Sequence, residues 1–216
     1  MSDAQTDPPR QRRERKQNAD KRRRQVLDAT YRSIVSNGLQ RTTLATVAAE
    51  AGLSQGVAVF YFKSKKGLLS EALRDLYLIY EAHWQEAVEA AGDDPAAQLV
   101  ALVKADFDPK ICNPAILSVW FAFWGEQKFT PQYGEITREF DDNRQRAIQG
   151  ICARMLPDDP EHAADVADWV DTLTDGYWQN LHLFPASYSN RRACNSTLRA
   201  LAALMPEYRD QLTPAD

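Results

Sequence analysis

The amino-acid sequence predicts an all-α protein, with an N-terminal helix-turn-helix domain on a larger C-terminal helical bundle. Only nine glycines occur among the 216 residues, which argues against a turn-rich β protein. From residue 94 onward, four prolines each follow a side chain that can cap a helix: Asp94-Pro95, Asn113-Pro114, Thr130-Pro131 and Asp159-Pro160. This pairing is typical of the first turn of a helix. The apolar residues after each pair recur every three or four positions, as along one helix face.

About nine helices are expected, in the following order. A disordered basic arm covers residues 1–19, and a first helix runs from about Ala19 to Asn37, where Asn37-Gly38 ends it. Short helices follow at 43–51 and 55–61, and a long one at 65–91. The others are expected at 95–107, 114–127, 131–155, 160–182 and 188–204. The corresponding domains are 20–66 for the helix-turn-helix and 67–207 for the rear bundle.

Residues 42–54, TTLATVAAEAGLS, have the pattern of a helix followed by a tight turn. Leu44, Val47, Ala48 and Ala51 recur at i, i+3, i+4 and i+7, which places them on one helix face. Thr42 or Thr43 can cap this helix, Gly52 ends it, and Ser54 can cap the next one. Helix, short glycine-containing turn and helix is the spacing of a helix-turn-helix.

The next stretch, VAVFYF at 57–62, is β-branched and aromatic, so its propensity alone favours a buried strand. Lys63, Lys65 and Lys66 follow at once, which a buried strand would not tolerate. A short recognition helix is the preferred interpretation, with Ala58 and Phe62 facing the core. The side chains expected to point outward, toward base edges in a major groove, are Gln55, Val57, Phe60 and Tyr61.

Charge is distributed unevenly along the chain. Residues 1–80 hold 15 Lys and Arg against 8 Asp and Glu, a net +7, whereas the remainder is net −11. This asymmetry indicates that only residues 1–80 bind a polyanion. The alternative is that the charges are simply solvated and have no partner. The basic residues between Arg10 and Arg24 could attract phosphates without specificity or enter a minor groove.

Several classes of protein are disfavoured by composition and motifs. No apolar run is long enough to span a membrane, and residues 1–24 lack the apolar core of a signal peptide, so a cytoplasmic protein is expected. The three cysteines and three histidines show no metal-ligand spacing, and no cofactor motif is present. No phosphate loop or nucleophile elbow occurs, so we expect no enzyme activity. A helical enzyme or a carrier that never binds DNA remains the alternative from another class.

Residues 20–70 resemble the TetR family of bacterial transcriptional regulators. The resemblance rests on Thr42-Thr43, on 48–54 (AAEAGLS), and on 61–65 (YFKSK) followed by Leu68-Leu69. It implies a repressor that binds double-stranded operator DNA as a homodimer and responds to a small-molecule effector. The DNA-binding residues it implies are Thr42, Thr43, Gln55, Val57 and Phe60, with Tyr61 and Lys65 on phosphates. Many relatives carry His in place of Tyr61 and a polar residue in place of Val57, and valine offers only apolar contact to thymine.

The rear of the chain contains an unusual group of aromatic residues. Trp120 and Trp124 share one helix face, and Asp171, Asp175 and Trp178 share a face of another helix. Rings together with a carboxylate suit a quaternary ammonium ion, whereas tryptophans that simply fill a core are the alternative. The candidate ligand-binding residues are Trp120, Trp124, Asp175, Tyr177 and Trp178.

This region also resembles one branch of the family, the BetI repressors of the choline-to-glycine-betaine pathway. The matching residues are Phe107-Asp108, the WFAFW run at 120–124, and Asp175-Gly176 followed by Trp178. The resemblance implies choline as the effector. A regulator of multidrug efflux or of another catabolic pathway, with a different effector, is the alternative within the family.

Two stripes of small and apolar residues suggest where a dimer forms. One contains Ala163, Val166, Ala167 and Val170, and the other contains Leu198, Leu201, Ala202 and Leu204. Each could pack against a second copy or face its own bundle.

Overall fold

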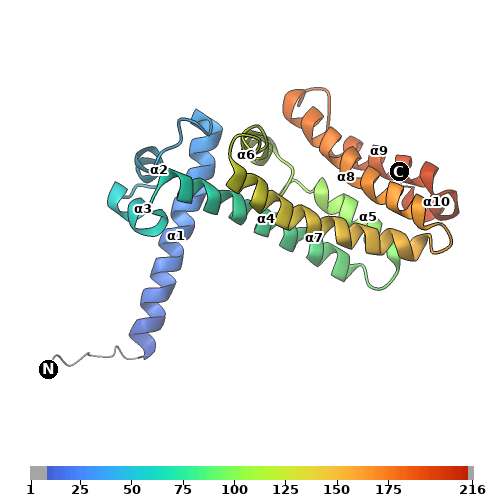
Figure 1. Ribbon diagram of the computed structural model, residues 1–216, viewed down its shortest axis with the longest axis horizontal. Helices are drawn as coiled ribbons and strands as arrows, with labels where there is room; N and C mark the ends of the chain where they lie inside the picture. The colour runs from blue at the N-terminus through green and yellow to red at the C-terminus, as the bar shows by residue number, and fades with distance from the viewer. Residues whose placement is uncertain (1–8, 214–216) are drawn as a thin grey trace. The chain divides into compact units, whose positions relative to one another are not determined.

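The computed structural model describes residues 9–213, and the side chains of residue 13 and of residues 15 onward. This part of the chain contains helices and no strand (Figure 1). It divides into two compact units, one ending at Ala72 and the other beginning at Leu73. The all-α prediction is confirmed. The proposed functional division at 66–67 stays a prediction.

The helices of the first unit are α1 (Pro9–Asn37), α2 (Leu44–Glu50), α3 (Gln55–Phe62) and the start of α4 (Lys65–Ala90). Those of the second are the rest of α4, α5 (Pro95–Asp106), α6 (Pro114–Trp124), α7 (Pro131–Met155), α8 (Pro160–Leu183), α9 (Asn190–Leu204), the 3₁₀ turn η1 (Pro206–Tyr208) and α10 (Arg209–Leu212). The nine expected helices are present. The sequence did not predict η1 and α10, because elements of three or four residues are too short to show a period.

The first helix begins at Pro9, so the expectation of disorder up to residue 19 is wrong for residues 9–19. Residues 10–24 contain neither Gly nor Pro, are rich in Arg and Lys, which favour helices, and follow a proline suited to the first turn. The N-terminal half of α1 extends past α2 and α3 (Figure 1). Residues 1–8 of the proposed arm lie outside the described residues. The end at Asn37 is as expected, with Gly38 at φ +76°.

In the first unit, α2 packs against both α1 and α3. Thr43 caps α2 in a reciprocal capping box with Thr46, and Gly52 takes the left-handed conformation at φ +64° in the turn. Ser54 precedes α3 without a side-chain cap bond, contrary to its predicted role. Residues 57–62 are helical, with Ala58 and Phe62 buried, so tertiary packing overrides their β propensity.

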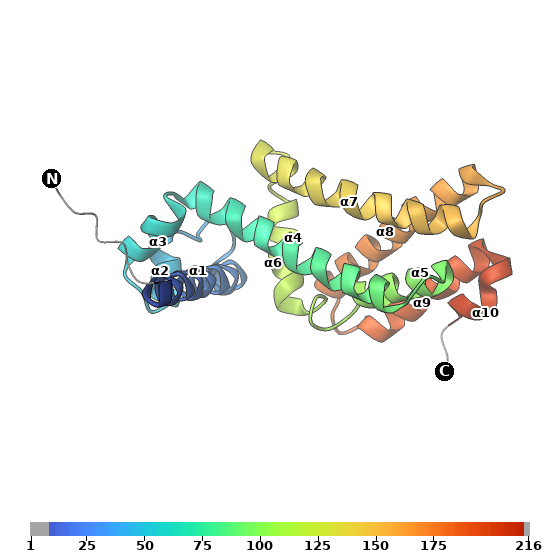
Figure 2. The same cartoon turned by 90° about the horizontal axis from the view of Figure 1, so that it is seen from below.

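In the second unit, three of the four predicted caps are observed. Asp94, Asn113 and Asp159 accept bonds from first-turn amides, whereas Thr130 makes no side-chain cap bond. Helix α7 packs on α5 and α8, and α9 packs on α5 and α8. Helix α6 runs crosswise to α7 (Figure 2) and contacts α8. Side chains from α4, α6, α7 and α8 line one cavity.

Candidate functional sites

The outward face of α3 is largely apolar. Gln55, Gly56, Val59 and Phe60 are exposed, with Val59 at 40% and Phe60 at 67%, whereas Val57 and Tyr61 are half-buried. Gln55, Val57, Phe60 and Tyr61 were predicted to lie on this face, but Val59 was not. Its position four residues after Gln55, one helical turn further on, was the signal that could have identified it.

The two threonines before α2 have different surroundings. Thr42 is fully buried, and its Oγ1 donates to the Gly38 carbonyl at 3.0 Å and lies 3.2 Å from Ser33 Oγ. It therefore cannot contact DNA, and its predicted role is wrong: a hydroxyl here satisfies the backbone of the turn. Thr43 is half-buried and caps α2, where its Oγ1 accepts from the Thr46 amide at 3.1 Å.

Two lysines after α3 are anchored at their ammonium groups. Lys65 donates to the Gln40 carbonyl, which joins the start of α4 to the loop before α2. Lys63 adopts φ +65° and donates from Nζ to the Phe60 carbonyl at 2.7 Å. A lysine ammonium has three donor hydrogens, so each retains donors for a phosphate.

The second unit contains a cavity of about 600 Å³. One wall is aromatic and consists of Tyr77 and Tyr80 from α4, Trp120 and Trp124 from α6, and Trp178 from α8. The ring centroid of Trp120 lies 6.0 Å from those of both Trp124 and Trp178. The rings of Trp124 and Trp178 are nearly parallel, at 17° and 6.3 Å. Trp120 and Trp178 are almost fully buried, whereas Trp124 is half-exposed.

The rest of the lining, the acidic wall, carries four carboxylates, Asp141, Asp168, Asp171 and Asp175, and one guanidinium, Arg144. Burial and the charge of Asp171 raise the pKa of Asp175 to about 7 and that of Asp141 to about 6. Both side chains still reach water, and after burial the second cause of the raised pKa values is the crowding of like charges in a concave site. A cation here would relieve that crowding.

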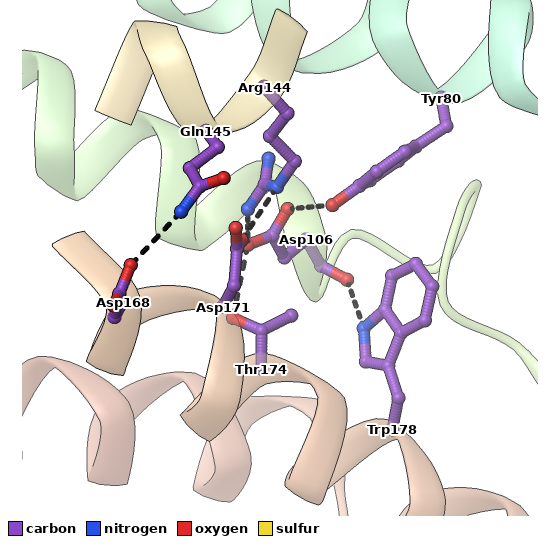
Figure 3. A network of polar contacts seen from close by, with 8 residues as sticks. All are labelled: Tyr80, Asp106, Arg144, Gln145, Asp168, Asp171, Thr174 and Trp178. Atoms are coloured by element: carbon purple, nitrogen blue, oxygen red, sulfur yellow. Dashed lines mark hydrogen bonds and ion pairs between the residues drawn. The ribbon is translucent and has the colours of Figure 1, made fainter. Parts of the chain in front are cut away.

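A buried polar network supports both walls (Figure 3). Arg144 donates from Nη2 to Asp106 Oδ2 at 2.8 Å and from Nε to Asp171 Oδ1 at 2.9 Å. Asp106 also accepts from Tyr80 at 2.8 Å and from Thr174 at 3.2 Å. Burial raises the pKa of Asp106, and these donors oppose that shift. We assign an ionised carboxylate, because one full charge and two hydroxyls converge on it.

Asp106 and Arg144 were not among the residues predicted from the sequence. The signal was a charged residue on an apolar stripe: Asp106 follows Leu99, Leu102 and Val103 at helical spacing, and Arg144 stands between Phe140 and Ile148. A buried charge at such a position requires a partner of opposite sign.

The structure does not bring Tyr177, a predicted ligand-binding residue, to the cavity. This residue adjoins Trp178 on α8, and one residue along a helix turns a side chain by about 100°. Tyr177 consequently packs edge-on to Phe107, with 6.3 Å between ring centroids, and does not line the cavity. The other four candidates, Trp120, Trp124, Asp175 and Trp178, all line it.

Both stripes considered for dimerisation face their own bundle. Ala163, Val166, Ala167 and Val170 are at most 3% exposed, and Leu198, Leu201 and Ala202 at most 4%, whereas Leu204 is half-buried. On the outside of α8, by contrast, Trp169 is 38% exposed and Leu183 is 53% exposed.

Three further features bear on possible function. Within residues 9–213, no helix is long and apolar enough to cross a membrane. The same residues contain no group of His, Cys, Asp and Glu side chains arranged to hold a metal ion. Cys112, Cys152 and Cys194 are buried, free thiols.

The sequence matches known families in both units. Residues 26–72 match the family described as bacterial regulatory proteins, TetR family, and residues 95–206 match the BetI-type transcriptional repressor C-terminal domain. The HTH-type transcriptional regulator BetI of Burkholderia thailandensis is 37% identical over 164 residues, which cover 73% of this chain and 80% of the relative. The BetI regulator of Stenotrophomonas maltophilia is 34% identical over 160 residues, covering 73% and 79%.

Two solved structures share the fold. A transcriptional regulator from Pseudomonas aeruginosa PAO1 aligns with a TM-score of 0.78 at 21% identity, covering 89% of this chain and 94% of the other. A transcriptional regulator from Saccharomonospora viridis, solved in complex with choline, aligns with a TM-score of 0.72 at 21% identity, covering 82% and 94%.

Proposed function

Since this chain belongs to the TetR family, carries a BetI-type C-terminal domain and is a ligand-responsive DNA-binding repressor, we propose that its effector is choline or a closely related quaternary ammonium. The genes it controls would then be those that convert choline to glycine betaine. We also propose a cytoplasmic location, because a bacterial operator lies in that compartment.

The observation that carries this proposal is a single cavity lined by both aromatic rings and carboxylates. A quaternary ammonium has no proton to donate, so ring faces and negative charge hold it. Trp124 and Trp178, nearly parallel, present two such faces, and Asp175 stands one helical turn from Trp178. Trp120 supports both rings from behind. The choline bound by the Saccharomonospora viridis regulator is consistent with this assignment.

The buried network has a positioning role in this proposal. Trp178 donates from Nε1 to the Asp106 carbonyl at 3.0 Å, and Tyr80 donates to the Asp106 carboxylate. Arg144 fixes Asp171 through its Nε bond. The Asp106–Arg144 pair therefore fixes Tyr80 and Asp171, and the backbone carbonyl of Asp106 fixes Trp178.

The first unit supplies the DNA-binding surface. We propose that α3 enters the major groove with Gln55 and Phe60 toward the bases and Val57 at the edge of the contact. Tyr61 and Lys65 would contact phosphates, as would the first turn of α2 at Thr43. TetR-family regulators act as dimers, and the outer face of α8, with Trp169 and Leu183, is the surface that we propose for dimer contact.

Helix α4 connects the two activities along the chain. It begins with Lys65 and carries Tyr77 and Tyr80, which line the cavity. We propose that choline changes the position of α4 and thereby lowers operator affinity, which would derepress the genes.

Operator release by choline tests this proposal. Fluorescence anisotropy of a labelled operator duplex with the full chain should show dissociation as choline chloride is added. Sodium chloride at equal concentration is the control, because salt alone weakens DNA binding. Release by both salts to the same extent would mean that choline is not the effector.

The size of the cavity favours one alternative effector. A volume of about 600 Å³ lies in the range that encloses drug-sized molecules, whereas choline is much smaller. A bulky organic cation, as expected for an efflux regulator, would use the same rings and carboxylates. It would release the operator at concentrations where choline has no effect.

A further inference from the structure

The recognition helix presents unusually few groups that can hydrogen-bond a base. Gln55 is the only exposed side chain of α3 with a donor or acceptor, since the other exposed residues are Gly56, Val59 and Phe60. A recognition helix that identifies bases through hydrogen bonds would carry several Arg, Asn or Gln side chains on this face. Specificity here must therefore come mainly from apolar contact.

The exposed ring of Phe60 is held in place by its neighbours. The edge of Tyr61 meets it with 5.1 Å between ring centroids, and the Lys63 ammonium lies 5.2 Å from its centroid. Lys63 also donates to the Phe60 carbonyl from an unusual backbone conformation at φ +65°. A ring that is 67% exposed yet contacted on two sides is ordered before any partner arrives.

Gly56 provides independent support for close contact with a partner at this face. A β-carbon there would meet only Ser54 Oγ, at 3.8 Å, so the fold does not require glycine. Glycine inside a helix destabilises it relative to alanine. A residue that costs stability and is not needed for packing suggests that another molecule approaches the backbone closely.

We propose that α3 reads thymine methyl groups through Val59 and Phe60, and that Gln55 reads one adjacent base, with adenine as the matching partner. This inference rests on the proposed entry of α3 into the major groove. Gln55 and Val59 are four residues apart, about 6 Å along the helix axis, which corresponds to roughly two base-pair steps. Each half-site should therefore contain an adenine and at least two thymines within about three base pairs.

Replacing thymine by deoxyuridine in the operator tests the inference, because this change removes the methyl group and leaves base pairing intact. The operator is first selected from random duplexes with the full-length protein. Each thymine is then replaced in turn, in both half-sites, and the dissociation constant is measured at one fixed salt concentration. Two positions per half-site should show binding weakened about three- to fivefold for each methyl removed.

Variants assign the methyl groups to side chains. In Phe60→Ala, deoxyuridine at one of the two sensitive positions should no longer weaken binding. In Val59→Ala, deoxyuridine at the other position should no longer weaken binding. In Gln55→Ala, both positions should stay sensitive while discrimination at one base pair relaxes. Phe60→Leu keeps an apolar side chain, so deoxyuridine at the position contacted by Phe60 should still weaken binding, though less than in the unchanged protein. All three positions are exposed on α3, and circular dichroism checks that each of the four variants folds.

Two results would contradict the inference in different ways. Specific operator binding that no deoxyuridine substitution weakens would overturn methyl readout and leave the repressor function intact. Failure to enrich any sequence from the random duplexes would overturn the proposed DNA-binding role of α3 and this inference with it.

Discussion

The Nη2 atom of Arg144 lies 2.8 Å from Oδ2 of Asp106, and the two side chains are only 7% and 0% exposed. The remaining nitrogen, Arg144 Nη1, is buried without a hydrogen-bond partner among the described residues. The guanidinium lies 5.3 Å from the ring centroid of Tyr80 and 5.9 Å from that of Trp84. This pair joins α5 to α7, and Arg144 lines the cavity.

Asp106→Asn should strongly destabilise the second unit. Removing one charge of a buried pair leaves the other uncompensated, and Asp171 only partly replaces it, so we expect a loss of about 3 kcal/mol in the free energy of unfolding. Asp168→Asn is the matched control, because Asp168 is exposed and only accepts from Gln145 at 3.1 Å. It should cost less than about 0.5 kcal/mol. Urea unfolding measures both, and equal losses would contradict a structural role for the pair.

Trp124→Leu should weaken choline binding far more than it weakens the fold. The change keeps apolar volume but removes a ring face worth about 1–2 kcal/mol to a cation, so the Kd should rise about five- to thirtyfold. Tyr177→Leu removes an aromatic ring that lies outside the cavity and should leave the Kd unchanged. Calorimetric titration decides between them. A larger effect at Tyr177 than at Trp124 would place the ligand elsewhere.

Choline affinity should fall as the pH drops from 8 to 5.5. The pKa values of about 7 for Asp175 and about 6 for Asp141 mean that both carboxyls take up protons in this window. A bound cation favours their ionised forms, so protonation opposes binding, on the order of tenfold across the range. In Asp175→Asn, the change in choline affinity near pH 7, which comes from the titration of Asp175, should disappear. A Kd that is flat with pH would rule out contact between the cation and these carboxyls.

The same groups predict how the ligand-free protein responds to pH. Their pKa values in the folded protein are raised above about 3.9, the unfolded value, so the folded state binds protons that the unfolded state has lost. The stability they contribute is fully present below pH 4 and is lost as the pH rises through 6 and 7. Thermal unfolding at pH 5 and pH 8 should therefore show a larger stabilising effect of Asp175→Asn at pH 8. Equal effects at both pH values would contradict the raised pKa.

Trp169→Glu should dissociate the dimer. A tryptophan at the centre of an interface commonly contributes 2 kcal/mol or more, so the dimer dissociation constant should rise at least about thirtyfold. Phe129→Glu is the control, since Phe129 is 74% exposed and lies outside α8. Sedimentation equilibrium compares the two variants. An unchanged dimer in Trp169→Glu would move the interface to another face.

Helix positions were predictable where local chemistry fixes them. Asp94, Asn113 and Asp159 cap their helices as expected, because a capping oxygen and a following proline act within one turn. The start of α1 was missed, since its first turns carry almost no apolar residues and so show no period. Charged helix formers alone extend that helix to Pro9.

The cavity was predictable only in part, for a geometric reason. Trp120 and Trp124 share a helix face by spacing, as do Asp175 and Trp178, so these pairs follow from period alone. Arg144 and Asp106 are 38 residues apart, and only the packing of α5 against α7 brings them together. Tyr77 and Tyr80 likewise reach the cavity from α4, a helix that gave no sign of a ligand site.

The most direct test of the central claim is a calorimetric titration of the dimer with choline and with its neutral isostere 3,3-dimethylbutanol at pH 8. The two ligands have nearly the same shape, so a difference between them reports the charge. We predict that choline binds at least tenfold more tightly, because Asp175 and the rings of Trp124 and Trp178 recognise the cation. Equal binding of the two ligands, or no binding of choline, would contradict a quaternary ammonium site in this cavity.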